Sequence, residues 1–192
     1  MNTALDSKDL LIRTLPTPNP NALKFVINSS VKDEGKATFN TPEECQDLPL
    51  VRDLFALPGV KQIHLFQNTI TVTHAGELDN DKLSQSVEAV LRTRFAVHDP
   101  RFGDSGPKPR ERVISADPQM QAIEAILDRT IRPGLQADGG DIELLSLENN
   151  ELRILYQGAC GGCPSSTAGT LDAIQGILRH ELGNEAILVV PV

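Results

Sequence analysis

Residues 141–164 read DIELLSLENNELRILYQGACGGCP, and this stretch determines how the second half of the chain folds. Apolar and polar residues alternate over residues 141–147 and again over residues 151–157, which is the pattern of strands with one buried face. The polar residues Glu148-Asn149-Asn150 between them are typical of a tight turn. We therefore expect a β-hairpin that leads directly into the cysteine-containing segment.

Helices are expected on both sides of this hairpin. Upstream, Asp117 is a good N-cap for a helix that Pro133-Gly134 should end. Downstream, a helix over residues 164–182 should be followed by a last strand over residues 186–190. The order α-β-β-α-β predicts a small mixed sheet with two helices. The apolar residues at helical spacing are Met120, Ile123, Ile126, Leu127 and Ile131 in the first helix, and Leu171, Ile174, Leu178 and Leu182 in the second.

The first half of the chain predicts another small α+β unit. Apolar residues at Leu83, Val87, Val90 and Leu91 recur at the spacing of one helix face. Alternating or apolar runs bounded by Pro, Gly and Asn indicate the other elements. These are strands over residues 22–27, 60–66 and 69–73, and a short helix over residues 49–57.

Pro and Gly residues concentrate in the middle of the chain. Residues 97–115 lack apolar periodicity and are typical of an extended linker. The sequence therefore predicts an α+β protein of two small domains, residues 1–96 and 116–192. Charge differs between the halves: residues 1–112 carry a net −1, whereas residues 113–192 carry a net −7.

Composition excludes several classes of protein. No run of about 18 apolar residues exists in the 192, so we expect no membrane span. A net charge of −8 argues against nucleic-acid binding, which needs a basic surface. Three cysteines cannot all pair within the chain, which argues against a disulfide-stabilised secreted scaffold. The first nine residues have no apolar signal core and include two acids, so a cytoplasmic location is expected.

The most informative motif is the pair Cys160 and Cys163. Two thiols at this spacing can face one metal centre, as in iron–sulfur and zinc sites. Gly161 and Gly162 between them allow positive φ angles and bring backbone N–H groups near the sulfurs. A helix that begins at Pro164 would point its positive end at both thiols, which favours thiolates and an anionic cluster.

The motif alone permits several chemistries. Two cysteines at a helix N-terminus also occur in dithiol oxidoreductases, although here the pair follows a hairpin rather than a βαβ unit. Zinc needs about four ligands, and His180 lies too far along the helix to join the pair. Two buried structural thiols are a further alternative. A 4Fe–4S cluster generally requires about four thiolate ligands, which two chains related by a two-fold axis would supply.

Longer stretches around the motif resemble a known family. RPGLQADGGDIEL at residues 132–144, followed by GACGGCPSS at residues 158–166, is similar to the NifU C-terminal-type domain of the Nfu iron–sulfur carriers. TPNPNALKF at residues 17–25 and LPGV at residues 57–60 resemble the Nfu N-terminal domain. Together the two resemblances cover most of the chain.

The resemblance implies a homodimeric carrier rather than an enzyme. It implies that Cys160 and Cys163 match the ligand cysteines of a 4Fe–4S cluster held between two chains, with a 2Fe–2S cluster as another state. The implied partners are an upstream cluster-assembly scaffold and apo iron–sulfur client proteins, which the N-terminal domain is expected to recognise. The dithiol oxidoreductase and an adaptor with a vestigial motif are the alternatives.

Other polar residues carry weaker signals. Cys45 stands alone and is interpreted as an incidental thiol, with a role as a transient extra ligand as the alternative. The four histidines are given no metal-binding role. The turn Asp138-Gly139-Gly140-Asp141 is interpreted as a tight helix-to-strand connection closed by Asp141, which could pack near the cysteine loop and shape its edge.

Overall fold

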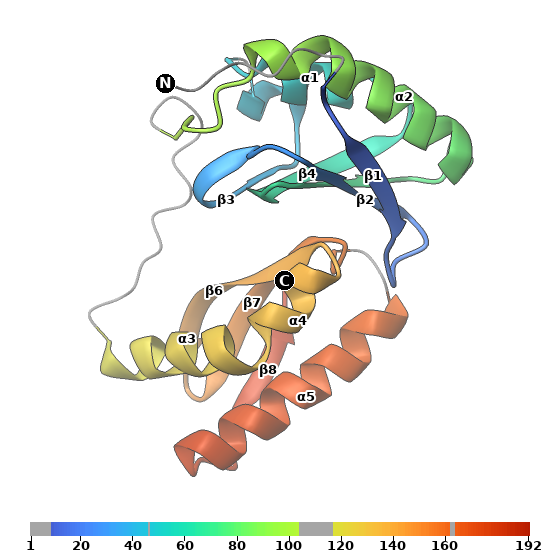
Figure 1. Ribbon diagram of the computed structural model, residues 1–192. Coiled ribbons are helices and arrows are strands. Elements are labelled where there is room, and N and C mark those ends of the chain that lie inside the picture. The colour runs from blue at the N-terminus through green and yellow to red at the C-terminus, as the bar shows by residue number, and fades with distance from the viewer. Residues whose placement is uncertain (1–8, 46, 104–116, 162–163) are drawn as a thin grey trace.

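The structure is a computed structural model that describes residues 9–45, 47–103, 117–161 and 164–192, with the backbone alone for residues 164–168. Two sheets with separate hydrophobic cores confirm the expected α+β fold of two domains (Figure 1). Most of the predicted linker lies outside the described residues, so the domain limits stay a prediction.

Five antiparallel strands form the N-terminal sheet, in the order β1-β2-β5-β4-β3. Figure 1 shows α1 and α2 on one face of this sheet, while the other face looks toward the C-terminal domain. The elements are β1 (Ile12–Pro16), β2 (Ala22–Ile27), β3 (Lys32–Phe39), η1 (Pro42–Cys45), α1 (Pro49–Phe55), β4 (Val60–Gln67), β5 (Thr69–His74), α2 (Asn80–Arg94) and η2 (Phe95–Val97).

The central strands β4 and β5 of the N-terminal sheet are buried on both faces along their middle residues. Leu65 of β4 and Ile70 of β5 are paired and point into the core beneath the helices. Because side chains alternate along a strand, the neighbouring pair His64 and Thr71 points to the opposite face. Both are nevertheless buried, and His64 lies against Gly158 of the C-terminal domain. The C-terminal domain therefore covers polar groups that an isolated sheet would expose to water.

Strands β1 and β3 were not predicted from the sequence. Strand β3 lies at the edge of the sheet, and its first half, Lys32-Asp33-Glu34-Gly35, is largely exposed. Gly35 has a φ of 68°, and the pairing with β4 shifts register between Lys32 and Lys36. An irregular, solvated edge strand gives no apolar alternation for sequence analysis to detect.

The C-terminal domain contains the predicted hairpin and the two predicted long helices. Asn149 and Asn150 have φ angles of 51° and 66°, which a two-residue turn between twisted strands requires. Strand β8 pairs in parallel with β7 and completes a mixed sheet of order β6-β7-β8. The elements are α3 (Pro118–Thr130), α4 (Arg132–Ala137), β6 (Gly140–Glu148), β7 (Glu151–Gly158), α5 (Pro164–Leu182) and β8 (Leu188–Pro191).

The short helix α4 differs from the expectation. Pro133-Gly134 was predicted to end the first helix, but α3 ends at Thr130 and the proline lies in the first turn of α4. Proline suits that position, because the first N–H groups of a helix have no partner within it. The expected α-β-β-α-β order therefore gains one short helix that leads into the glycine turn.

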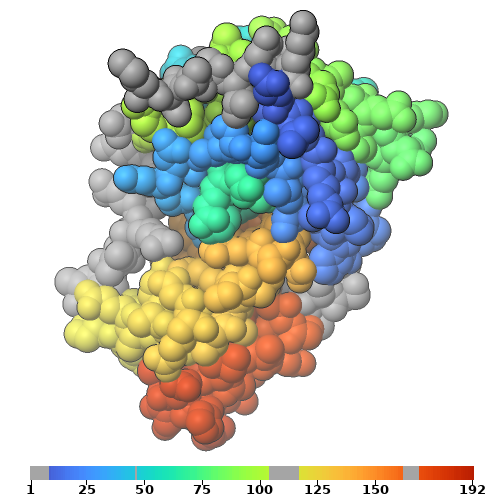
Figure 2. All heavy atoms as spheres, viewed as in Figure 1, coloured from blue at the N-terminus to red at the C-terminus, as the bar shows by residue number. Residues whose placement is uncertain are grey.

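The two domains are in contact. In Figure 2 the blue-to-green half of the chain sits directly on the yellow-to-red half. The contact brings strands β4 and β5 of the first sheet against β7 of the second. Among the described residues, no helix is both long enough and apolar enough to cross a membrane.

Candidate functional site

Cys160 lies in the turn between the end of β7 and the start of α5. Gly158, the last residue of β7, has a φ of 62°, and its carbonyl oxygen accepts a hydrogen bond of 3.0 Å from the N–H of Gly161. The side chain of Cys160 is half-buried. Its predicted partner Cys163 lies outside the described residues, as does Gly162. The loop containing the described residues Gly158–Gly161 is called the cysteine loop below.

The glycine turn before β6 packs against this loop. A Cβ atom added to Gly140 would lie 2.3 Å from Cys160 Sγ and 2.8 Å from the backbone nitrogen of Cys160. A Cβ atom on Gly158 would lie 2.4 Å from the carbonyl oxygen of Gly139, which accepts a hydrogen bond from Ala159 N at 3.1 Å. The turn therefore shapes the edge of the cysteine loop, and only glycine leaves room for the sulfur of Cys160.

Asp141 closes the glycine turn, as expected from the sequence. Its Oδ1 accepts a hydrogen bond of 2.7 Å from Ile142 N, and its Oδ2 accepts one of 3.2 Å from Gln136 Nε2. The sequence did not indicate its ion pairs. Asp141 is 1% exposed and lies 2.8 Å from Lys36 Nζ and 3.3 Å from Arg132 Nε.

A chain of buried charges supports the turn. Burial by itself would raise the pKa of Asp141, but the charge and hydrogen bond of Lys36 hold it below its ordinary value. Arg132, 4% exposed, pairs with Glu124 at 2.9 Å and also with Asp128. Burial disfavours the charge of Arg132, yet its bonds to Glu124 and its other acidic neighbours raise its pKa above the ordinary value. These paired charges hold the turn under the cysteine loop.

Side chains of the N-terminal domain also reach the cysteine loop. Asn19 Nδ2 donates a hydrogen bond of 2.9 Å to the carbonyl oxygen of Gly161. Gln62 Oε1 accepts one of 2.6 Å from Gly158 N, and Thr73 Oγ1 donates one of 3.3 Å to Gly158 O. Sequence analysis missed these residues. Asn19 does lie in the segment that resembles the Nfu N-terminal domain, but nothing in that segment points to the loop.

Tyr156 lies near Cys160 at the end of β7. Its pKa is raised to about 12, first by burial and then by the negative charge that Cys160 carries when ionised. Loss of the phenol proton is therefore disfavoured at this position.

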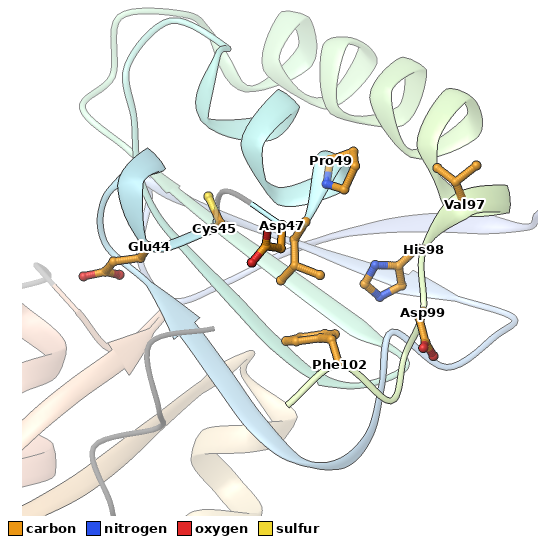
Figure 3. A pocket seen from close by; sticks show the side chains of 9 residues that line it. Glu44, Cys45, Asp47, Pro49, Val97, His98, Asp99 and Phe102 are labelled. Atoms are coloured by element: carbon orange, nitrogen blue, oxygen red, sulfur yellow. The ribbon is translucent and has the colours of Figure 1, made fainter. Parts of the chain in front are cut away.

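Cys45 is in a different setting. It is 2% exposed, and its Sγ donates to the carbonyl oxygen of Pro42 at 3.1 Å. Burial, followed by the charges of Glu44 and Glu43, raises its pKa to about 11. It borders a cavity of about 210 Å³ whose other wall includes His98 and Phe102 (Figure 3).

Two of the histidines, His64 and His98, are hydrogen-bonded within the N-terminal domain. His64 Nδ1 shares a hydrogen bond of 2.8 Å with Thr38 Oγ1, and burial lowers the pKa of His64 to about 4. His98 Nε2 bonds the carbonyl oxygen of Val31 at 2.8 Å. Within the described part of the chain, no three His, Cys, Asp or Glu side chains gather as a metal-binding group.

Comparisons with known proteins agree with this arrangement of domains. Residues 12–98 match the family described as "Scaffold protein Nfu/NifU N terminal", and residues 123–189 match the "NifU-like domain". The human "NFU1 iron-sulfur cluster scaffold homolog, mitochondrial" is 34% identical over 88% of this chain and 67% of its own length. "NifU-like protein 5, mitochondrial" of Arabidopsis thaliana is 32% identical over 90% of this chain and 65% of its own.

The chain spans about two thirds of the length of these relatives. Among solved structures, a NifU-like protein from Saccharomyces cerevisiae superposes with a TM-score of 0.42 at 20% identity, over 50% of this chain and 84% of that one. A Staphylococcus aureus protein matches 42% of this chain and 96% of its own, with a TM-score of 0.38 and 25% identity. Similarities at this level add nothing to the description of the site.

Proposed function

The chain belongs to the Nfu/NifU family of iron–sulfur cluster scaffolds, and from that membership we propose that it carries a 4Fe–4S cluster between two copies of itself. Cys160 and Cys163 of each copy would be the ligands, with a 2Fe–2S cluster as an alternative state. The observation that carries the proposal is the position of Cys160. Its half-buried thiol lies in a glycine-shaped turn just before α5.

The surroundings of Cys160 suit an anionic cluster. The N-terminus of a long helix carries a partial positive charge and N–H groups without helical partners. Gly140 leaves room for the sulfur, and the paired charges of Asp141 and Arg132 hold the turn beneath it. A site fixed in this way places thiolates without a costly rearrangement on binding.

Ligand number supports a dimer. A 4Fe–4S cluster takes about four thiolates, and one motif supplies two. A second copy would complete the set, so that the cluster would bridge two identical loops. A cluster held between separable chains can be released to another set of thiolates, which is the property of a carrier.

Release would proceed by ligand exchange. A thiolate of the client binds an iron atom as the thiolate of Cys160 or Cys163 leaves it, so the charge balances and no electron moves. Thiolates of low pKa are good leaving groups, and the helix terminus favours low pKa. The chain would therefore be a binding and transfer protein rather than an enzyme.

The partners follow from this role. An assembly scaffold would load the cluster, and apo iron–sulfur proteins would receive it, with the N-terminal domain contributing to recognition. Ligand thiols also need a reducing compartment, for which we propose the cytoplasm. The human and Arabidopsis relatives are named as mitochondrial proteins.

A transfer assay tests the proposal. The reconstituted protein is mixed anaerobically with an apo-enzyme that requires a 4Fe–4S cluster, in the presence of an iron chelator. We expect the enzyme to become active faster than with iron and sulfide alone, because the cluster passes directly between thiolates. Activation that the chelator suppresses completely would contradict direct transfer. A chain that binds no iron and instead forms a reversible Cys160–Cys163 disulfide would be a dithiol oxidoreductase.

A further inference from the structure

The helix-free face of the N-terminal sheet is occupied by the C-terminal domain. Polar side chains from separate segments of the first domain reach across to the glycine turn and the cysteine loop. Many of their partners are backbone atoms, so the contact depends on the shape of these two segments. The contacts are Asn19 to Gly161 O, Lys24 to Ala137 O, Lys36 to Asp141 and to Ile142 O, Gln62 to Gly158 N, and Thr73 to Gly158 O.

An ion pair between Lys36 and Asp141 spans this contact. Lys36 is 15% exposed, and its Nζ lies 2.8 Å from a carboxylate that is almost fully buried. Lys36 belongs to residues 1–112, which carry a net charge of −1, whereas Asp141 belongs to residues 113–192, which carry a net charge of −7. Separating the domains would leave the buried carboxylate of Asp141 with Arg132, 3.3 Å away, as its remaining cationic partner. Loss of one of two cations beside a carboxylate of such low exposure is costly.

The same contact leaves buried polar atoms without hydrogen bonds. His64 Nε2 and Thr71 Oγ1 have no partner among the described residues, and both side chains lie against the glycines of the C-terminal domain. Each unsatisfied buried group opposes the contact, because it has given up its hydrogen bonds to water. Separating the domains would return these atoms to water, so their burial opposes the ion pair.

We propose that the helix-free face of the N-terminal sheet is an intramolecular docking surface for the cysteine loop, and that docking competes with formation of the cluster-bridged dimer. The second part of this inference rests on the proposed function. Hydrogen bonds hold the backbone on both sides of Cys160. Gln62 and Thr73 bond Gly158. Asn19 bonds Gly161. A second copy must bring its own loop to the same place, which requires this face to withdraw.

Thiol labelling tests the docked state without any iron. In a Cys45→Ala/Cys163→Ser background, Cys160 is the single cysteine, and its reaction with a bulky polyethylene-glycol maleimide reports access to the loop. We expect Lys36→Met to accelerate labelling of the apo chain about tenfold, the equivalent of about 1.4 kcal/mol. Lys61→Met is the matched control, because Lys61 is exposed on the neighbouring strand β4, and it should leave the rate unchanged.

Gln62→Ala is a second variant that removes a loop contact without touching the ion pair. Circular dichroism shows whether each variant remains folded, and Gln62→Ala replaces Lys36→Met if the latter does not. Equal labelling rates in the folded variants, the control and the parent would overturn the docking surface.

Reconstitution of the same substitutions in the three-cysteine chain tests the competition. Lys36→Met should form the iron-loaded dimer faster than the wild type and Lys61→Met. Faster labelling with unchanged dimer formation would overturn the competition. Faster labelling with no iron bound by any chain, the wild type included, would support the docking surface and overturn the proposed function.

Discussion

Cys45 and Cys160 have opposite surroundings in the same chain. Cys45 ends a short 3-10 helix, is buried, and donates its thiol proton to the carbonyl oxygen of Pro42. Cys160 is half-buried in a turn that the glycines at positions 140 and 158 keep open for it. The backbone around each thiol therefore decides how accessible its sulfur is.

The largest expected difference is in the iron bound by variants that lack one thiol or the other. Cys160→Ala should reduce bound iron after anaerobic reconstitution from about two atoms per chain to background, because the remaining thiolates are too few for a cluster. Cys45→Ala should retain the full amount. Iron and sulfide assays on both variants measure this, and a full cluster in Cys160→Ala would refute the ligand assignment.

Alkylation kinetics test whether the thiol of Cys45 is buried and poorly ionised. Its pKa of about 11, against an ordinary value of 9.0, leaves about a hundredfold fewer thiolates at neutral pH. In a Cys160→Ser/Cys163→Ser chain we expect iodoacetamide to modify Cys45 at least a hundredfold faster in denaturant than in buffer. The rate in buffer should rise with pH through the alkaline range. Comparable rates in the two solvents would show that Cys45 is an accessible thiol after all.

Gly140→Ala tests the backbone that supports Cys160. The added Cβ would overlap both Sγ and the backbone nitrogen of Cys160, and overpacking of this kind costs about 3 kcal/mol at the upper end of its usual range. Urea unfolding of the apo chain measures the change. Gly176→Ala is the control, because Gly176 lies on the exposed side of helix α5 and nothing lies within 4 Å of an added Cβ. It should stabilise the chain by about 0.5–1 kcal/mol. Equal stability of the two variants would contradict the tight packing at Gly140.

The smallest expected effect is the contribution of His64, beneath the cysteine loop, to the pH dependence of the free energy of unfolding. Burial lowers its pKa to about 4, with Asp141 opposing and Lys36 adding to the shift. In the unfolded chain His64 therefore becomes protonated below about pH 6.5, whereas in the folded chain it becomes protonated only below about pH 4. This contribution to stability is complete above pH 6.5 and is lost as the pH falls.

The expected loss is about 2 kcal/mol between pH 7.5 and pH 5. Urea unfolding at both pH values measures it in the wild type, in His64→Gln and in His180→Gln, whose histidine is exposed. His64→Gln should lack this part of the pH dependence, whereas His180→Gln should keep it. Identical pH dependence in all three proteins would mean that His64 is not sequestered.

Local patterns predicted the parts of the fold that local chemistry decides. The hairpin was predicted from the apolar alternation and from Asn149-Asn150, which tolerate positive φ angles. The predicted N-cap at Asp117 is also confirmed, because its side chain accepts a hydrogen bond of 2.9 Å from Gln119 N. Strand β3 was missed because a solvated edge has no apolar alternation. Helix α4 was missed because a proline can begin a helix as well as end one.

The site was predicted in part for the same reason. The cysteine pair and the adjoining glycine turn are visible in the sequence, and the structure packs that turn against Cys160. The contact between Asn19 and Gly161 joins residues 142 positions apart, and no local spacing encodes such a meeting. Cys163 lies outside the described residues, and the ligand roles of both Cys160 and Cys163 stay predictions.

Anaerobic reconstitution of the wild-type chain with iron and sulfide tests the central claim most directly. Iron and sulfide counts, the mass in solution and a Mössbauer spectrum would be recorded on one sample. A bridging 4Fe–4S cluster predicts about two irons and two sulfides per chain, in a particle of two chains that separates when the cluster is chelated. A cluster-bearing monomer, or a chain that binds no iron, would contradict it.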